Sequence, residues 1–129
     1  MNILGLALCL MSTNIYASTP PSEKHVFKNT DHEINFEVER GAGDVTLYIQ
    51  SSFFNTYDQI IVERMGEANG GYTACKTIDV PKAKISGDYY MTSDKFPLPA
   101  KTESSYRLKT IAKDGTTKTF PPVQLAGRQ

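Results

Sequence analysis

Two neighbouring carboxylates are the first residues in this sequence whose types and spacing suit chemistry. Glu37 and Glu39 are separated by one residue, which in an extended strand puts their Cα atoms about 7 Å apart on one face. Paired carboxylates in different environments can act as general acid and base. These two also belong to the outward half of an alternating strand, where acidic side chains oppose edge pairing. We therefore interpret them as part of a solvent-exposed strand face. The sequence contains no Asp-x-Asp loop of the kind that binds calcium.

Cys75 and two histidines are the other reactive candidates. A nucleophilic thiol needs a neighbouring histidine to lower its pKa, but His25 and His32 both come far earlier in the chain. Without a third ligand, these histidines make a poor metal site. Strict alternation places Cys75 opposite the apolar register of its segment, so intermolecular disulfide pairing stays open. We predict no catalytic residue, no metal, no cofactor and no enzymatic activity.

A run of aromatic residues has some binding character. The partner-binding candidates are Phe53, Phe54, Asn55 and Tyr57, because aromatic side chains on a connection offer a large contact area at a small entropy cost. The alternative is that Phe53 or Phe54 caps the core and Tyr57 begins the next strand. The sequence contains no Trp for stacking on a sugar.

Alternation of apolar and polar residues indicates the elements that must position these side chains. A period of two is what a half-buried strand needs, and no window carries a helical period. Gly and Pro punctuate the segments, as in a two-sheet sandwich, with a small barrel as the alternative. The seven predicted strands are Glu33–Glu39, Val45–Gln50, Tyr57–Met65, Tyr72–Val80, Ile85–Thr92, Tyr106–Ala112 and Thr116–Leu125. Pro121 and Pro122 place the last strand at a sheet edge.

The N-terminus is typical of an export signal. Residues 3–11 are uncharged and apolar, too few for the about 20 residues of a membrane span. A polar stretch then closes on Ala17, which we take as the cleavage site. An uncleaved anchor, or a lipoprotein box ending at Cys9, is the alternative. The predicted organisation is a signal peptide at residues 1–17, a flexible lead-in at 18–31 and one domain at 32–126.

Composition narrows the classes of partner. The 14 basic and 14 acidic residues balance, whereas nucleic acid and anionic membranes favour a clear basic excess. After cleavage only Cys75 would remain of the two cysteines, so an apolar core rather than an internal disulfide must hold the domain. We expect a secreted, periplasmic or cell-surface protein without stable membrane insertion.

Several short motifs occur in the order found in a known module. They are Asn55, Tyr57-Asp58, Val62-Glu63-Arg64, Gly70-Gly71-Tyr72, Tyr106-Arg107-Leu108-Lys109 and Asp114-Gly115. The chain thus resembles a fibronectin type III-like module of secreted bacterial surface proteins over about residues 32–126. The resemblance implies a single all-β, seven-stranded antiparallel β-sandwich of the immunoglobulin and fibronectin type III kind. It also implies a tyrosine corner, in which the Tyr106 hydroxyl bonds to backbone.

A spacer or protein-binding surface is the usual role that this resemblance implies, without catalysis. We therefore predict an exported, non-catalytic interaction module whose partner is another protein, with glycan as a second option. A protease inhibitor that inserts the loops at residues 53–57 and 66–71 is the rival function. A carbohydrate-binding module and a hydrolase using Glu37 or Cys75 are further alternatives.

Overall fold

The computed structural model describes residues 24–65, 70–95, 97 and 103–125. This part of the chain is all-β, with two single-turn 3-10 helices at Phe54–Thr56 and Val80–Lys82. The strands are β2 (Ile34–Arg40), β3 (Val45–Ser51), β4 (Tyr57–Met65), β5 (Tyr72–Asp79), β6 (Tyr89–Asp94), β7 (Ser104–Ala112), β8 (Thr117–Thr119) and β9 (Val123–Leu125). Among the described residues there is no helix with the length and apolar character needed to span a bilayer.

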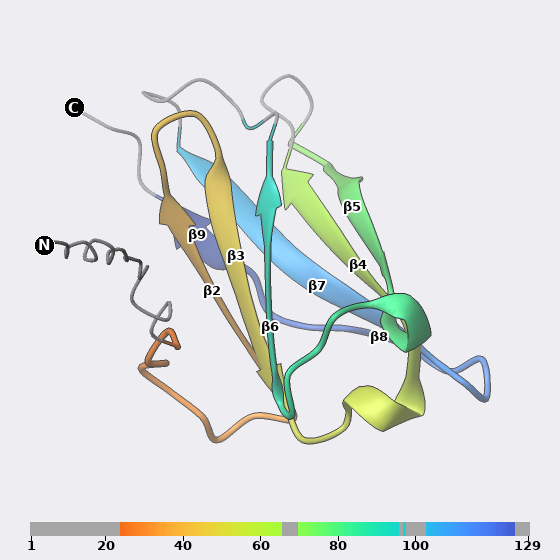
Figure 1. Cartoon of the computed structure of the whole chain (residues 1–129). Coiled ribbons are helices and arrows are strands. Elements are labelled where there is room, and N and C mark those ends of the chain that lie inside the picture. Colours follow the sequence, from red (N-terminus) through yellow and green to blue (C-terminus); the bar gives the residue numbers. More distant parts are fainter. Residues whose placement is uncertain (1–23, 66–69, 96, 98–102, 126–129) are drawn as a thin grey trace, which may run out of the picture.

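The strands form two antiparallel sheets packed face to face (Figure 1). One sheet has the order β2-β3-β6, and the other has the order β5-β4-β7-β8 with β9 also pairing with β7. The predicted antiparallel β-sandwich is confirmed. The sequence predicts seven strands and the structure describes eight, because Pro121 and Pro122 divide the last one into β8 and β9.

Alternating side chains build the core between the two sheets. In β3 every second residue is buried, and in β4 the buried positions include Ile60 and Val62. Each such strand contributes one apolar face, as period-two alternation requires. The fully enclosed apolar residues, none more than 2% exposed, are Val45, Leu47, Ile49, Tyr57, Ile60, Val62, Tyr106 and Leu108.

Turns with left-handed glycines set where some strands begin. Gly115, at φ 90°, completes the predicted Asp114-Gly115 hairpin between β7 and β8. Gly87, at φ 65°, lies in a tight turn in which the backbones of Ser86 and Tyr89 exchange two hydrogen bonds. Because this turn occupies residues predicted as strand, β6 begins at Tyr89 instead of residue 85.

A β-bulge changes which face Cys75 occupies. Val62 pairs with Lys76 and Glu63 pairs with Ala74, so Cys75 is the extra residue on β5. The bulge breaks strict alternation. Ala74 is exposed, and the half-buried Cys75 packs against the core. The apolar register that strict alternation predicts for β5 is therefore wrong on the N-terminal side of Lys76.

The described part of the lead-in, residues 24–31, runs without helix or strand before β2. Its His25 ring stacks on Tyr48 of β3 at 3.9 Å between ring centroids, and Phe27 meets the edge of Tyr89 of β6. This segment therefore lies against the outer face of the β2-β3-β6 sheet. The predicted leader at residues 1–17 lies outside the described residues.

Candidate functional site

A groove opens at the seam between the two sheets, where the edge strand β2 faces β8 and β9. Its volume is about 420 Å³, within the range of about 300–1,000 Å³ typical of ligand pockets. Apolar side chains supply most of its surface, and Leu108 of β7 lies behind them. The lining residues are Asn29, His32, Glu33, Ile34, Asn35, Phe36, Glu37, Leu108, Lys118, Phe120, Pro121, Pro122 and Val123.

The groove exists because the last strand is interrupted. Phe120 still pairs with β7, since its N–H donates to the Leu108 carbonyl at 2.9 Å. Pro121 and Pro122 have no N–H and cannot continue the ladder, and pairing with β7 resumes only at Val123. The interruption leaves the Phe120 and Val123 side chains only partly buried against the core. They form one apolar wall of the groove, and Phe36 of β2 forms part of the other.

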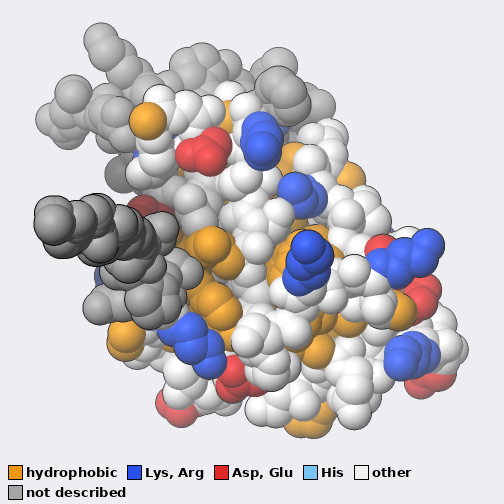
Figure 2. Space-filling view, in the orientation of Figure 1, with side chains coloured by type: hydrophobic (Ala, Val, Ile, Leu, Met, Phe, Trp, Pro, Cys, Tyr) orange, Lys and Arg blue, Asp and Glu red, His pale blue; other side chains and the backbone are white. Residues whose placement is uncertain are grey.

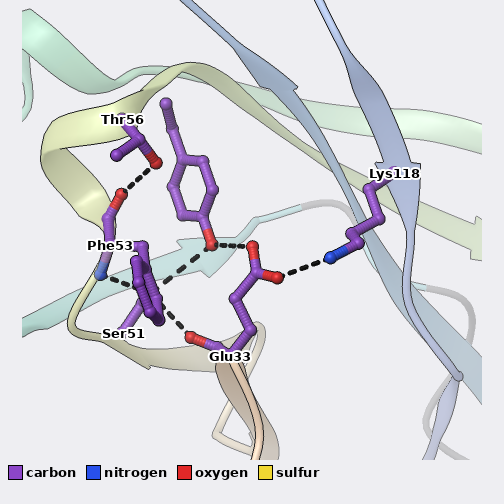
Figure 3. A network of polar contacts seen from close by, with 6 residues as sticks. Glu33, Ser51, Phe53, Thr56 and Lys118 are labelled. Atoms are coloured by element: carbon purple, nitrogen blue, oxygen red, sulfur yellow. Dashed lines mark hydrogen bonds and ion pairs between the residues drawn. The ribbon is translucent and has the colours of Figure 1, made fainter.

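A hydrogen-bonded carboxylate closes one end of the groove. Glu33 accepts a hydrogen bond from the Tyr57 hydroxyl at 2.7 Å and forms an ion pair with the Lys118 ammonium, which donates to it at 2.6 Å. Figure 3 shows Glu33 between Ser51 and Lys118, and the Ser51 hydroxyl donates to the Glu33 carbonyl at 2.8 Å. The Lys118 ammonium and the Tyr57 hydroxyl lower the pKa of Glu33. Glu33 therefore stays ionised and joins β2 to β8 across the seam.

The carboxylates singled out from the sequence face the outer side of the β2-β3-β6 sheet. Glu37 accepts from His25 Nε2 at 2.7 Å and from the Lys28 N–H at 2.8 Å. Glu39 accepts from the Tyr48 hydroxyl at 2.7 Å. Both are thus acceptors in separate surface contacts. Figure 2 shows the molecule in the orientation of Figure 1, where hydrophobic side chains reach the surface in separate patches among the charged ones.

The two histidines have different neighbours. His25 is held by Glu37 and Tyr48, whereas the His32 ring lies 3.4 Å from the Asn29 side-chain amide and lines the groove. Within the described ranges, no three His, Cys, Asp or Glu side chains are grouped so as to hold a metal ion.

A buried polar cluster connects the sheets at the far end of the sandwich. The Arg64 guanidinium of β4 pairs with the Asp94 carboxylate of β6, which is only 4% exposed. The Tyr106 hydroxyl of β7 donates to the same carboxylate at 2.9 Å, and burial raises the pKa of Tyr106. Tyr106 is thus hydrogen-bonded to a side chain, unlike the backbone bond that the resemblance implies. We assign this cluster a structural role.

Cys75 lies beside that cluster. Burial raises the pKa of its thiol to about 11, and the Asp94 carboxylate adds to the rise. The protonated thiol is a poor nucleophile, so this environment is the opposite of what activates a catalytic cysteine.

The raised pKa predicts slow alkylation of Cys75. In a Cys9→Ser chain, we expect iodoacetamide at pH 8 to react about a hundredfold more slowly with the folded protein than with the unfolded one, because two pKa units change the thiolate fraction by that factor. Mass spectrometry of the alkylated fraction over time measures both rates. Equal rates before and after addition of guanidinium chloride would show that Cys75 is accessible and ionises normally.

The four partner-binding candidates are divided between core and surface. Phe54 and Tyr57 are 6% and 2% exposed, and their rings meet edge to face. Phe53 is 48% exposed and Asn55 is exposed. Of the predicted aromatic patch, Phe53 and Asn55 therefore remain available at the surface, and partner binding by this loop stays a prediction.

Most groove residues carry no distinguishing signal in the sequence. Pro121-Pro122 was visible as an edge signal, but Phe36 and Phe120 are separated by 84 positions and looked like ordinary strand residues. A useful signal was the proline pair itself, because it interrupts the ladder next to an apolar residue on either side.

Comparisons with known proteins support the fold alone. No family model matches the sequence, and no curated protein matches it. A pectate lyase from Pectobacterium carotovorum is similar in structure, with a TM-score of 0.57 and 10% identity over 74% of this chain. The chicken interferon gamma receptor alpha chain is similar at a TM-score of 0.54 and 9% identity over 73% of this chain.

This chain corresponds to part of each of those proteins. The alignment covers 27% of the pectate lyase chain and 50% of the receptor chain. At such low identity, likeness carries no activity or partner across. Together with the two-sheet topology, the comparisons establish that the chain has an immunoglobulin-like, fibronectin type III-like β-sandwich fold.

Proposed function

We propose that the protein is an exported, non-catalytic interaction module that holds a protein partner in the groove between β2 and β8–β9. The observation that carries this proposal is the groove itself, about 420 Å³ in volume and lined largely by apolar side chains. A concave apolar site with a few polar groups at its rim is the usual form of a binding site. The export signal predicted at residues 1–17 supports a role outside the cytoplasm, such as at a bacterial cell surface.

The chemistry of the lining favours protein over glycan. Phe36, Phe120, Pro122 and Val123 offer apolar contacts. The polar lining groups already bond within the protein: Glu33 with Lys118, Asn29 with His32, Asn35 with Gln50 and Glu37 with His25. Apolar side chains from a partner can displace water from such a surface with a favourable free energy. A sugar would need more polar partners than these to replace its hydrogen bonds with water.

Placing a charge in the groove tests the proposal. Pro122 lines the groove and is exposed; Pro81, in the 3-10 helix Val80–Lys82, is also exposed but is not among the lining residues. We expect proteins captured by the immobilised full chain from extracts and culture fluid of the source cells to be retained by Pro81→Arg and lost by Pro122→Arg. Quantitative mass spectrometry of the captured proteins gives the comparison. Circular dichroism checks that both variants keep the β-sheet spectrum.

Two results would overturn the proposal. One is capture of no protein above an inert-bead control. The other is a specific partner that Pro122→Arg retains as well as the unmodified chain does, since that partner would bind elsewhere, for example at Phe53 and Asn55.

A further inference from the structure

β2 is an edge strand whose open side borders the groove. Among the described strands it pairs with β3 alone, and an edge strand presents unpaired N–H and C=O groups in a row. Residues of β2 from Ile34 to Glu37 line the groove. The groove therefore lies beside both an apolar surface and the open backbone edge of β2. The strand register determines which residues of β2 point their N–H and C=O groups outward.

The hairpin bonds identify these residues. In an antiparallel pair, hydrogen-bonded and non-hydrogen-bonded positions alternate. The Gly41 N–H donates to the Asp44 carbonyl, so in the observed register Asn35, Glu37 and Glu39 bond to β3. The backbone groups of Ile34, Phe36 and Val38 then point away from β3. At the other end, the Ser51 N–H donates to the Asp88 carbonyl, which agrees with this alternation because Ser51 is opposite Ile34.

The residues whose backbone groups point away from β3 are the same ones whose side chains point into the core. Ile34 is buried, and Phe36 and Val38 pack against the core. Within residues 24–65, 70–95, 97 and 103–125, no hydrogen bond from another element reaches the outward N–H or C=O of Phe36 or Val38. Phe36 and Val38 thus each offer a donor and an acceptor beside an apolar surface, at a repeat of about 6.8 Å.

The opposite wall of the groove is protected from strand pairing. Pro121 and Pro122 lack the N–H that an added strand would need, and proline on an edge is a common means of preventing pairing. β2 contains no proline between Ile34 and Arg40. The seam therefore has one edge that can accept a strand and one that cannot.

We propose that the partner contributes an extended segment that adds to the open edge of β2, with apolar side chains in the groove and basic side chains on the outer face. This inference rests on the proposed function, because it specifies how that same groove is filled. An extended backbone matches the spacing of the outward donors and acceptors, as in other recognition by strand addition. Its alternate residues would contact Phe36 and the wall formed by Phe120 to Val123.

Negative charge on the outer face of β2 favours basic residues between the apolar residues of the partner segment. Glu37 and Glu39 lie on that face. Glu37 is half-buried and accepts from His25 and Lys28, whereas Glu39 is exposed. Residues of an added antiparallel strand opposite these two occupy non-hydrogen-bonded positions, where paired Cα atoms approach to about 4.5 Å. Opposite charges in such pairs are favourable and like charges are unfavourable. The segment is therefore expected to carry Lys or Arg at these positions.

The same arrangement disfavours a second copy of this chain. Antiparallel pairing of β2 with itself, with apolar faces aligned, sets Glu37 opposite Glu37, or Glu39 opposite Glu33 or Glu37 in the neighbouring registers. Each register places like charges directly across from one another, which is destabilising. A different protein with a basic, alternating segment suits the edge better than self-association does.

The test uses ¹⁵N-labelled full chain and the probe peptide acetyl-Lys-Val-Lys-Val-Lys-Val-Lys-amide. We expect the largest amide chemical-shift changes at Phe36 and Val38, together with slower hydrogen exchange at both amides, because the added strand would pair with them. Shift changes confined to the 53–57 loop, or spread over the whole surface, would contradict pairing at this edge.

Two N-methylated peptides separate strand addition from non-specific apolar binding. Peptide residues opposite Phe36 and Val38 exchange both backbone hydrogen bonds with β2, and these are the valines. Methylating the valine nitrogens should weaken binding at least about tenfold, because several bonds are lost, whereas methylating the lysine nitrogens should leave the affinity within about threefold. Equal effects of the two methylation patterns would overturn the proposal.

Charge reversal on β2 supplies a second readout. Glu39→Lys should weaken the lysine peptide about tenfold and favour acetyl-Glu-Val-Glu-Val-Glu-Val-Glu-amide instead. The matched control is Asp58→Lys, because Asp58 is exposed on β4 of the other sheet and changes the net charge equally. If Asp58→Lys weakens binding as much as Glu39→Lys does, the attraction is to net charge and the proposal fails.

The two proposals can fail separately. If Pro122→Arg abolishes capture of the partner but the peptides bind equally in both methylation patterns, the groove remains the binding site and strand addition is refuted. A captured partner that is insensitive to Pro122→Arg refutes the proposed function, whatever the peptides do.

Discussion

Asp94→Ala is expected to lower the free energy of unfolding by about 3–5 kcal/mol, because it removes the buried carboxylate that pairs with the partly buried Arg64 guanidinium. Asp94 is 4% exposed and the Arg64 side chain is 19% exposed. The Tyr106 hydroxyl loses its acceptor as well. Native domains are stable by only about 5–15 kcal/mol, so this single change removes a large part of the total.

Chemical denaturation followed by circular dichroism measures the loss. Tyr106→Phe removes one hydrogen bond to a charged group and should cost less, about 1.5–3 kcal/mol. Asp58→Ala removes an exposed carboxylate and should stay within about 0.5 kcal/mol of the unmodified chain. Adding Arg64→Met to Asp94→Ala should recover part of the stability, because the uncompensated charge is gone. An Asp94→Ala variant as stable as Asp58→Ala would refute the buried pair.

Leu108→Ala is expected to lower the free energy of unfolding by about 2–5 kcal/mol, the range for removing a buried leucine side chain. Leu108 is 0% exposed at the centre of β7, and it lies behind the apolar walls of the groove. The lost contacts and the remaining cavity both contribute to the cost. The same change should also weaken the groove as a binding surface.

Urea unfolding curves of three variants test this expectation. Leu108→Met keeps a similar volume and should cost less than about 1.5 kcal/mol. Val26→Ala changes a side chain that is 85% exposed and should have little effect, within about 0.5 kcal/mol. If Leu108→Ala costs no more than Val26→Ala, Leu108 is not a core residue.

Alternation predicted most of the strands because burial of one face is a local property of each strand. β4 begins and ends at the predicted residues Tyr57 and Met65. β3 extends the predicted Val45–Gln50 by one residue. In both, the side chains that alternate in hydrophobicity are the ones that meet the opposite sheet, so pattern and packing agree.

Departures from prediction occur where one residue changes the backbone path. Gly87 adopts a left-handed conformation that turns the chain and delays β6. The bulge at Cys75 leaves Ala74 exposed and packs Cys75 against the core, and its position depends on pairing with β4. A period-two pattern contains no information on either event, since both depend on backbone geometry and partner strands.

The candidate groove forms from residues that are far apart in the sequence. Phe36 and Phe120 become neighbours of one cavity only when the sheets pack, and the ion pair between Glu33 and Lys118 joins residues 85 positions apart. Phe54 and Tyr57, chosen from the sequence as binding residues, are buried because the 3-10 turn at Phe54–Thr56 directs both into the core.

From its sequence alone this protein is an all-β sandwich, because alternating side chains along each strand demand two faces with different surroundings. The proline pair likewise identifies an edge, because proline lacks the N–H for a central ladder. Tertiary structure decided which residues meet at the seam, which backbone groups of β2 point outward and which side chains bury the Asp94 carboxylate. Those outcomes depend on strand order, register and sheet packing, which join residues far apart in the chain.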